Sequence, residues 1–311
     1  MTIYERQDRA GGLLIYGIPN FKLDKSVVER RTRRLEEGGV VFKLNFEVGR
    51  DASLTELRSR HDAVYVAAGA YAARALTCPG GGGRGLVPAL DYLTASNKAG
   101  FGDESGQGGR LNASGKRVLV IGGGDTAMDC VRTAIRQGAD SVACLYRRDR
   151  VNMPGSAREV VHAEEEGAMF DWLSAPAAIL GDAETASGVR IQKMTLGAPD
   201  ASGRRRPVAM AGQEEDRAAD MVIAALGFEP ENFPQTLGAE GLELNPRGAI
   251  RVTDRSRTSL PGVYAGGDAV RGASLVVWAV KDGLDAAETI HADLMAGARS
   301  AQAQPIAEPA E

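Results

Sequence analysis

Short apolar runs alternate along the chain with longer stretches in which apolar residues recur every three or four positions. The short runs predict buried β-strands, the longer stretches predict amphipathic helices, and their alternation indicates a parallel sheet with crossover helices. Strands are expected at residues 2–4, 62–67, 117–121, 141–146, 221–226 and 262–265. Helices are expected at residues 26–37, 126–137 and 275–294. The pattern predicts an α/β fold of about two domains.

Composition narrows the classes of function. Of 311 residues, 37 are Lys or Arg and 41 are Asp or Glu, which gives a net charge of −4 and no sign of a surface for nucleic acid or an anionic membrane. No apolar run approaches the roughly 20 residues of a transmembrane helix, and the first residues lack the pattern of a secretory signal. We therefore expect a cytoplasmic protein. Its 39 glycines and 5% aromatic residues favour nucleotide binding over a β-sandwich or barrel.

The cysteines exclude two kinds of site. Cys78, Cys130 and Cys144 are too few and too widely spaced for a disulfide framework or a redox Cys-x-x-Cys pair. The three histidines are also far apart in the sequence, so no metal site is expected. Cys130 falls on a predicted helix, where we expect it to be buried and unreactive.

The most informative segment is RVLVIGGGDTAMDC at residues 117–130, which joins a predicted strand, a glycine turn and a helix. In this context Gly122, Gly124 and Ala127 form a G-x-G-x-x-A pattern typical of dinucleotide binding. The first glycine permits the tight turn, the second lets the backbone approach a pyrophosphate, and the alanine permits close packing of helix and strand. The N–H groups at the helix start would face the phosphates. The alternative is an ordinary glycine-rich connection.

The next predicted strand indicates which nicotinamide cofactor binds. A site for NAD places an acidic residue about 20 positions after the first glycine, to bond the ribose 2′-hydroxyl. Here that strand ends in Arg147 and Arg148, and Arg147 is 25 positions after Gly122. Guanidinium groups suit a 2′-phosphate, which favours NADPH over NADH. The alternative is a solvated basic turn.

Two other segments suggest a second nucleotide site. Residues 264–270 read YAGGDAV, a strand that ends in glycines and Asp268, and a helix follows near Ser274. Residues 2–5 look like the second strand of a dinucleotide unit that ends in a ribose-binding acid, Glu5, although the first strand and its glycine turn should lie about 20 residues upstream. The alternatives are an aspartate that caps a helix and an ordinary first strand with a surface charge.

Taken together, these segments resemble the small (beta) subunit of bacterial NADPH-dependent glutamate synthase. The resemblance runs from about residue 2 to residue 294. Two motifs, YGIPNFKLDK and MPGSAREV, are more specific than any glycine pattern. The segments that carry the resemblance are residues 5–31, 40–45, 88–93, 120–130, 146–160, 164–176, 225–230 and 264–283.

The resemblance implies two Rossmann-like dinucleotide-binding domains, in which an FAD domain is interrupted by an inserted NADPH domain. The expected ranges are 1–105 and 231–295 for the two parts of the FAD domain, 106–230 for the NADPH domain, and 296–311 for a disordered tail. NADPH would reduce FAD, and electrons would pass through iron–sulfur clusters to the large (alpha) subunit, which makes glutamate from glutamine and 2-oxoglutarate.

The resemblance also assigns residues to the two cofactors, and it implies no catalytic acid, base or nucleophile. The FAD residues would be Glu5, Gly11, Gly12, Leu13, Gly69, Gly267, Asp268, Ser274, Leu275 and Val276. The NADPH residues would be Gly122, Gly124, Asp125, Thr126, Ala127, Arg147 and Arg148. Hinges between the domains are expected at residues 227–234 and near Phe101.

This sequence departs from the family pattern in one respect. The iron–sulfur cysteines and the first FAD glycine turn of the family precede the part that matches Met1. We therefore expect an N-terminally truncated member, or a sequence with a misassigned start codon, in which the first βα unit of the FAD domain is missing and FAD binding is weakened. The alternatives are a related NADPH–ferredoxin-type electron-transfer subunit, an inactive NADPH-binding fragment, and an enzyme like thioredoxin reductase, which would need the redox cysteine pair.

Overall fold

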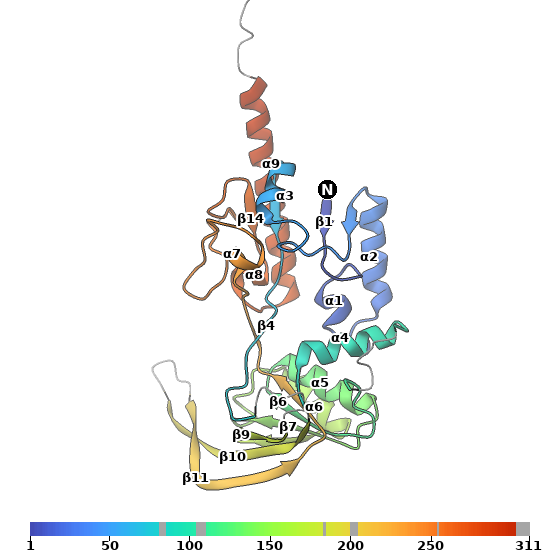
Figure 1. Cartoon of the computed structure of the whole chain (residues 1–311), viewed down its shortest axis with the longest axis vertical. Helices are drawn as coiled ribbons and strands as arrows, with labels where there is room; N and C mark the ends of the chain where they lie inside the picture. Colours follow the sequence, from blue (N-terminus) through green and yellow to red (C-terminus); the bar gives the residue numbers. More distant parts are fainter. Residues whose placement is uncertain (81–84, 104–109, 183–184, 200–204, 254, 303–311) are drawn as a thin grey trace, which may run out of the picture. The chain divides into compact units, whose positions relative to one another are not determined.

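The computed structural model describes residues 1–80, 85–103, 110–182, 185–199, 205–253 and 255–302 (Figure 1). The chain forms two compact units. Unit 1 consists of Met1–Ile3, Gln7–Phe42 and Ala73–Gly227, and unit 2 consists of Tyr4–Arg6, Lys43–Ala72 and Phe228–Glu311.

A five-stranded parallel sheet forms the centre of unit 1, as the alternating pattern predicts. In spatial order, its strands are β5 (Leu86–Pro88), β12 (Met221–Ala225), β6 (Arg117–Gly122), β7 (Ser141–Tyr146) and β8 (Met169–Trp172). Strand β6 lies between β12 and β7, so its carboxyl end is in the middle of the sheet edge.

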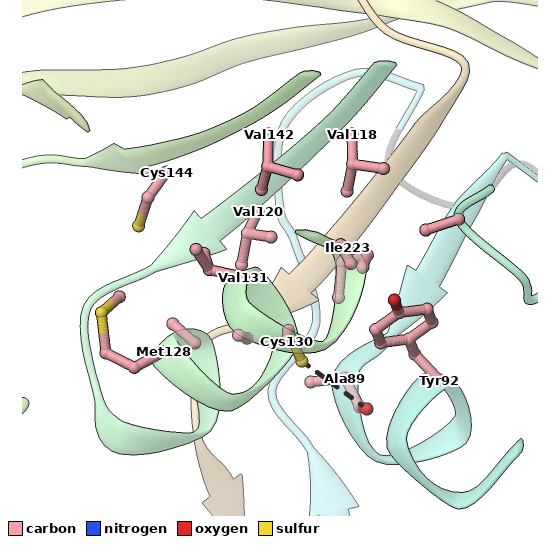
Figure 2. Packing of buried hydrophobic residues seen from close by; sticks show 14 of the residues in the cluster. Ala89, Tyr92, Val118, Val120, Met128, Cys130, Val131, Val142, Cys144 and Ile223 are labelled. Carbon is pink, nitrogen blue, oxygen red and sulfur yellow. Dashed lines mark hydrogen bonds between the residues drawn. The ribbon is translucent and has the colours of Figure 1, made fainter. Parts of the chain in front are cut away.

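The sheet is buried on both faces, which explains why its strands read as continuous apolar runs. Val118 and Val120 pack into the core beneath the helices, together with side chains of α5 (Asp125–Arg136) (Figure 2). Leu119 and Ile121 point the other way, into a second core. The helices that follow the strands are α4 (Ala89–Gly100), α5 and α6 (Ala157–Glu165).

An antiparallel three-stranded sheet supplies the second core of unit 1. Its order is β11 (Arg205–Ala218), β10 (Ala186–Pro199), β9 (Ser174–Gly181). Val189 and Ile191 of β10 are fully buried against the parallel sheet. The sequence did not predict these strands.

The segment before residue 43 contributes two helices to unit 1, α1 (Leu13–Tyr16) and α2 (Lys25–Glu37). Ile15, Tyr16 and Val28 form their small core. Asn97 of α4 donates a 2.9 Å hydrogen bond to the carbonyl of Tyr16, which fixes the end of α1 to the rest of the unit. The short strands β1 (Thr2–Tyr4) and β2 (Val41–Lys43) pair with each other.

Unit 2 has less sheet. Strand β3 (Val64–Val66) pairs in parallel with β14 (Val263–Ala265). Its helices are α3 (Leu54–Arg60), α7 (Phe233–Thr236), α8 (Asp268–Arg271) and α9 (Val276–Gln302). Leu54, Phe233 and Ile250 are central to its core. The short strands β4 (Ala72–Ala73) and β13 (Phe228–Glu229) pair where the chain passes from one unit to the other.

The predicted strands and helices are confirmed with small changes at their ends, but three expectations about organisation differ. The two units do not coincide with the ranges 1–105, 106–230 and 231–295. Phe101 lies inside unit 1, where Arg9 stacks on its ring and bonds Asp103, whereas residues 227–234 contain the unit boundary. The expected disordered tail is wrong for residues 296–302, because the alanine-rich sequence continues α9 to Gln302. Residues 303–311 lie outside the described residues.

Candidate dinucleotide-binding site

The turn after β6 needs its glycines for reasons of packing. Gly122 ends the strand with φ +154°, and a Cβ there would lie 2.2 Å from the carbonyl oxygen of Ala225 in β12. A Cβ on Gly123 would lie 2.3 Å from the ring of Tyr146. Such distances are too short for any side chain, so this close turn is possible only with glycine at both positions.

Helix α5 begins directly after this turn, with an open N-terminus. Gly124 is its N-cap; among the residues that the structure describes, no side chain caps the helix, and nothing lies within 4 Å of the position of a Cβ on Gly124. The first N–H groups of a helix have no partner within the helix and carry partial positive charge. Asp125, Thr126 and Ala127 form the first turn, and Ala127 is fully buried. This geometry suits a phosphate group.

A second loop packs on the same turn. The N–H of Gly155 donates to the carbonyl of Gly123 at 2.9 Å, and the N–H of Ser156 donates to the Asp125 carboxylate at 2.8 Å. Ser156 is also the N-cap of α6. These residues belong to the MPGSAREV motif. The motif supports the family resemblance, but the sequence alone did not indicate that it lies at this site. The site therefore contains the starts of two helices.

The three arginines after β7 have different environments. Arg150 makes a bidentate pair with Glu164 at 2.6 and 2.7 Å, and Arg147 is exposed. Arg148 is only 8% exposed, and its Nε has no hydrogen-bond partner among the described residues. A buried guanidinium nitrogen without a partner is costly. Of the three, Arg148 therefore has the strongest need for an anionic ligand.

The cysteines of unit 1 are part of its core. The Cys130 thiol points to the carbonyl of Ala89 at 3.9 Å (Figure 2), and the Cys144 thiol points to the carbonyl of Gly122 at 3.3 Å. Burial raises the pKa of Cys144 to about 12 and also raises that of Cys130. The prediction that Cys130 is buried is confirmed. Within the described ranges, no three His, Cys, Asp or Glu side chains are grouped closely enough to hold a metal ion.

The glycine turn of unit 2 lies after β14. Gly267 has φ +65°, and its N–H donates to the Asp282 carboxylate at 3.0 Å. Burial raises the pKa of Asp268, although its carboxylate accepts a hydrogen bond from the Ser274 N–H. The turn between α8 and α9 is thus held by Asp268.

Helix α9 begins with an apolar surface that unit 2 does not cover. Leu275 and Val277 are each 62% exposed, and Val276 and Trp278 are also exposed. Arg271 stacks on the Trp278 ring and pairs with Asp282. A flat apolar ligand that covered these side chains would remove their surface from water.

The other residues assigned to FAD lie in different units. Glu5 is in unit 2, where its backbone continues the pairing of β1 and β2 through Lys43 and Phe46. Gly69 is also in unit 2 and has φ +77°. By contrast, Gly11, Gly12 and Leu13 are in unit 1, at the start of α1. The structure groups the residues assigned to NADPH in unit 1, whereas it divides those assigned to FAD between the units.

Comparison with known proteins identifies the family. The model of the pyridine nucleotide-disulphide oxidoreductases matches residues 28–283. The chain is 60% identical to a Cereibacter sphaeroides protein provisionally named glutamate synthase [NADPH] small chain, over 93% of this chain and 70% of that protein. It is 57% identical to the glutamate synthase [NADPH] small chain of Azospirillum brasilense, over 99% of this chain and 64% of that protein. The chain belongs to this oxidoreductase family, in the branch of the glutamate synthase small chains.

The chain therefore spans about two thirds of the length of these family members. Among solved structures, that of Mycobacterium tuberculosis FprA in complex with NADPH aligns with a TM-score of 0.77 over 98% of this chain and 80% of that chain. The sequence identity is 20%, so the likeness shows the fold alone. The α/β dinucleotide-binding fold of this family is thereby confirmed. None of the described helices is long and apolar enough to span a membrane.

Proposed function

We propose that unit 1 binds NADPH and that the chain passes its electrons to FAD. The observation that carries the proposal is Arg148, a buried guanidinium whose Nε has no partner among the described residues. It lies two positions after the end of β7, the strand that pairs with β6 before the glycine turn. A 2′-phosphate would supply the missing acceptor and would compensate the charge.

The residues of unit 1 fit this cofactor. The turn at Gly122 and Gly123 lets the backbone come close to a pyrophosphate, and the open start of α5 at Gly124 would donate N–H groups to it. Arg148 would bond the 2′-phosphate, with Arg147 at its solvent side. Asp125 would act indirectly, since its carboxylate holds the loop at Ser156 over the turn.

For FAD, unit 2 offers residues of suitable chemistry. Asp268 would accept a hydrogen bond from a sugar-like hydroxyl, while Ser274, Leu275 and Val276 would face the flavin with an apolar surface that is otherwise exposed. Glu5, Gly69 and Gly267 would contact the rest of FAD. For Gly11, Gly12 and Leu13, which belong to unit 1, a role in FAD binding stays a prediction.

The chemistry requires little from the protein itself. When both cofactors are bound, NADPH supplies a hydride and FAD accepts it. The chain's residues bind and orient the two rings and exclude water, and no side chain needs to act as an acid or base. We extend the proposal to a large glutamate synthase subunit as partner, to electron transfer towards glutamate formation, and to a cytoplasmic location.

The first test is binding of NADPH to the purified chain. Arg148→Met should weaken NADPH binding by about 10- to 100-fold, as expected for a lost charge-assisted bond, and leave NADH binding unchanged. The control is Arg150→Met, because Arg150 is already paired with Glu164. Equal losses for NADPH and NADH, or none for either, would contradict the assignment of the 2′-phosphate.

The second test separates an enzyme from an NADPH-binding fragment. The chain is reconstituted with FAD, freed of excess, and titrated with NADPH without oxygen while the flavin absorbance is followed. Bleaching of bound flavin with stoichiometric NADPH is expected. Binding of NADPH without retained flavin would instead favour the fragment. An assay with glutamine, 2-oxoglutarate and a large subunit would then distinguish glutamate synthase from a ferredoxin-type electron-transfer subunit.

A further inference from the structure

Lys22 of the YGIPNFKLDK motif connects the two helices that start at the nucleotide turn. Its Nζ lies 2.7 Å from an Asp129 carboxylate oxygen on α5 and 3.1 Å from a Glu159 carboxylate oxygen on α6. Lys22 belongs to neither α5 nor α6; it lies in the segment before α2. One ammonium group therefore bridges two carboxylates from different elements.

Two arginines of α5 extend this cluster towards carboxylates in and after α6. Arg132 of α5 bonds Glu159 at 2.7 Å and Glu166 at 2.7 and 2.9 Å, and Arg136 bonds Glu166 at 2.8 Å. The ring of Phe21 lies under both guanidinium groups, at 4.7 and 4.4 Å from its centroid. Residues 21 and 22 thus join the segment before α2 to α5 and α6.

In this cluster, Lys22 supplies the positive charge on which the buried carboxylate of Asp129 depends. Asp129 is only 8% exposed, and this burial raises its pKa, as do the nearby carboxylates of Glu159 and Asp125. The charge of Lys22 opposes that increase. Without Lys22, two carboxylates would face each other with less compensation in a poorly hydrated place.

Other charged groups also act on this pair. Lys25 lies close enough to interact with Asp129, but burial lowers its own pKa to about 8, and its ammonium group donates to the carbonyls of Leu14 and Ile18. Glu159 also has Arg132 and, at 3.9 Å, His162. Of these groups, only Lys22 bonds both carboxylates.

The cluster lies one helical turn beyond the nucleotide site. Asp129 is four residues after Asp125 on α5, and Glu159 is three residues after Ser156, where α6 begins. The helix starts are joined by the bond between Ser156 and Asp125, and Lys22 joins the same helices one turn further on. The position of the loop over the turn therefore depends on both connections.

We propose that Lys22 is a positioning residue of the pyridine nucleotide site. By compensating Asp129 and Glu159, it keeps α6 and the loop at residues 153–156 against the turn at Gly123 and Asp125, without touching the nucleotide itself. This inference rests on the proposed binding of NADPH by unit 1.

The test compares NADPH affinity of the whole chain with variants of the cluster. Lys22→Met should weaken NADPH binding at pH 7.5 by about tenfold, a size typical of coupling through a packed network. Lys22→Arg should retain most of the affinity. Acidification should reduce the loss in Lys22→Met relative to wild type, because burial raises the pKa of Asp129 and the lost ammonium group no longer opposes that increase. The double variant Lys22→Met/Asp129→Asn should recover affinity at pH 7.5.

The control is Arg117→Met, which removes an arginine–carboxylate pair with Asp220 at the other end of β6 and should leave NADPH affinity unchanged. If wild type binds no NADPH, the proposed function fails. If wild type binds and Lys22→Met binds equally well, or if its loss is neither pH-dependent nor relieved by Asp129→Asn, the inference is overturned. Should Lys22→Met not fold, Lys22→Gln takes its place, with the same outcomes.

Discussion

The glycine turns after β6 and after β14 both follow a parallel strand and precede a helix, but their surroundings differ. In unit 1 the turn leaves the middle of a five-stranded sheet, and a Cβ on Gly122 would meet backbone at 2.2 Å. In unit 2 the turn leaves a two-stranded sheet, and a Cβ on Gly267 would meet nothing closer than the Ala279 Cβ at 3.5 Å. At these two positions, Gly122 is required by its neighbours, whereas Gly267 is required mainly by its own backbone conformation; in the second turn the close neighbour is at Gly266, where a Cβ would lie 2.3 Å from the Tyr65 hydroxyl.

The helices after the two turns differ in the same way. In α5, Ala127, Met128 and Val131 are completely buried in the core of unit 1 (Figure 2). In α9, Val276 and Val277 remain exposed. The same sequence pattern of strand, glycines and helix thus gives a buried helix start in unit 1 and a helix start with exposed apolar side chains in unit 2. We expect unit 1 to hold its shape without ligand and unit 2 to gain more from one.

The largest expected effect concerns the two glycines themselves. Gly122→Ala combines an unfavourable φ with a clash against Ala225 and should destabilise unit 1 by about 3 kcal/mol or more. Gly267→Ala adds backbone strain without a severe clash and should cost unit 2 about 1–2 kcal/mol. Urea unfolding of both variants measures the difference. Equal losses would show that the turns do not differ in the support they receive.

NADP⁺ and FAD should differ in the unit that each stabilises most. At a free concentration of about 100 times its Kd, a ligand stabilises the state that binds it by about 2.7 kcal/mol. NADP⁺ should therefore shift the unfolding of unit 1, and FAD that of unit 2. FAD should in addition reduce binding of a hydrophobic dye, since it would cover side chains such as Leu275 and Val277. A shift of unit 2 by NADP⁺, no shift of unit 2 by FAD, or an unchanged dye signal would contradict this division.

The glycine turn of unit 1 could be predicted almost completely, because its residues lie within one continuous segment. The strand, Gly122, Gly124 and the start of α5 follow one another in sequence, so local rules place them. The role of Asp125 was different: its partner Ser156 is 31 positions away, and no local pattern indicates that bond. Arg148 was identified as a candidate, but the burial that distinguishes it from Arg147 depends on tertiary packing.

Other features depend on contacts that a single sequence does not contain. Apolar and polar residues alternate only weakly along β10 and β11, because the outer strand β11 is largely exposed. The sequence analysis therefore did not predict the antiparallel sheet of unit 1. The grouping of residues 7–42 with unit 1 depends on distant pairs such as Lys22 with Asp129 and Asn97 with Tyr16. Such pairs leave no periodic signal in the chain.

The smallest expected effect comes from one surface ion pair in each unit. Arg117 lowers the pKa of Asp220 in unit 1 to about 2, and Arg257 lowers that of Asp293 in unit 2 to about 2. A lowered carboxyl pKa stabilises the fold above the unfolded value near 4, and this contribution is lost as the pH falls through about 2. Arg117→Met and Arg257→Met should therefore each lower stability slightly at pH 7 and less at pH 3.

The Arg117–Asp220 pair is exposed and the Arg257–Asp293 pair is half-buried, so 1 M salt should remove most of the first effect and a large part of the second. Each carboxylate also keeps one other donor, the Arg117 backbone N–H for Asp220 and the Tyr264 hydroxyl for Asp293. The two variants should then behave alike, because neither pair depends on the sheet that distinguishes the units. Urea midpoints at pH 7 and pH 3, with and without salt, measure this. A loss confined to one unit, or one that persists in salt, would show that the contrast between the units extends to their surfaces.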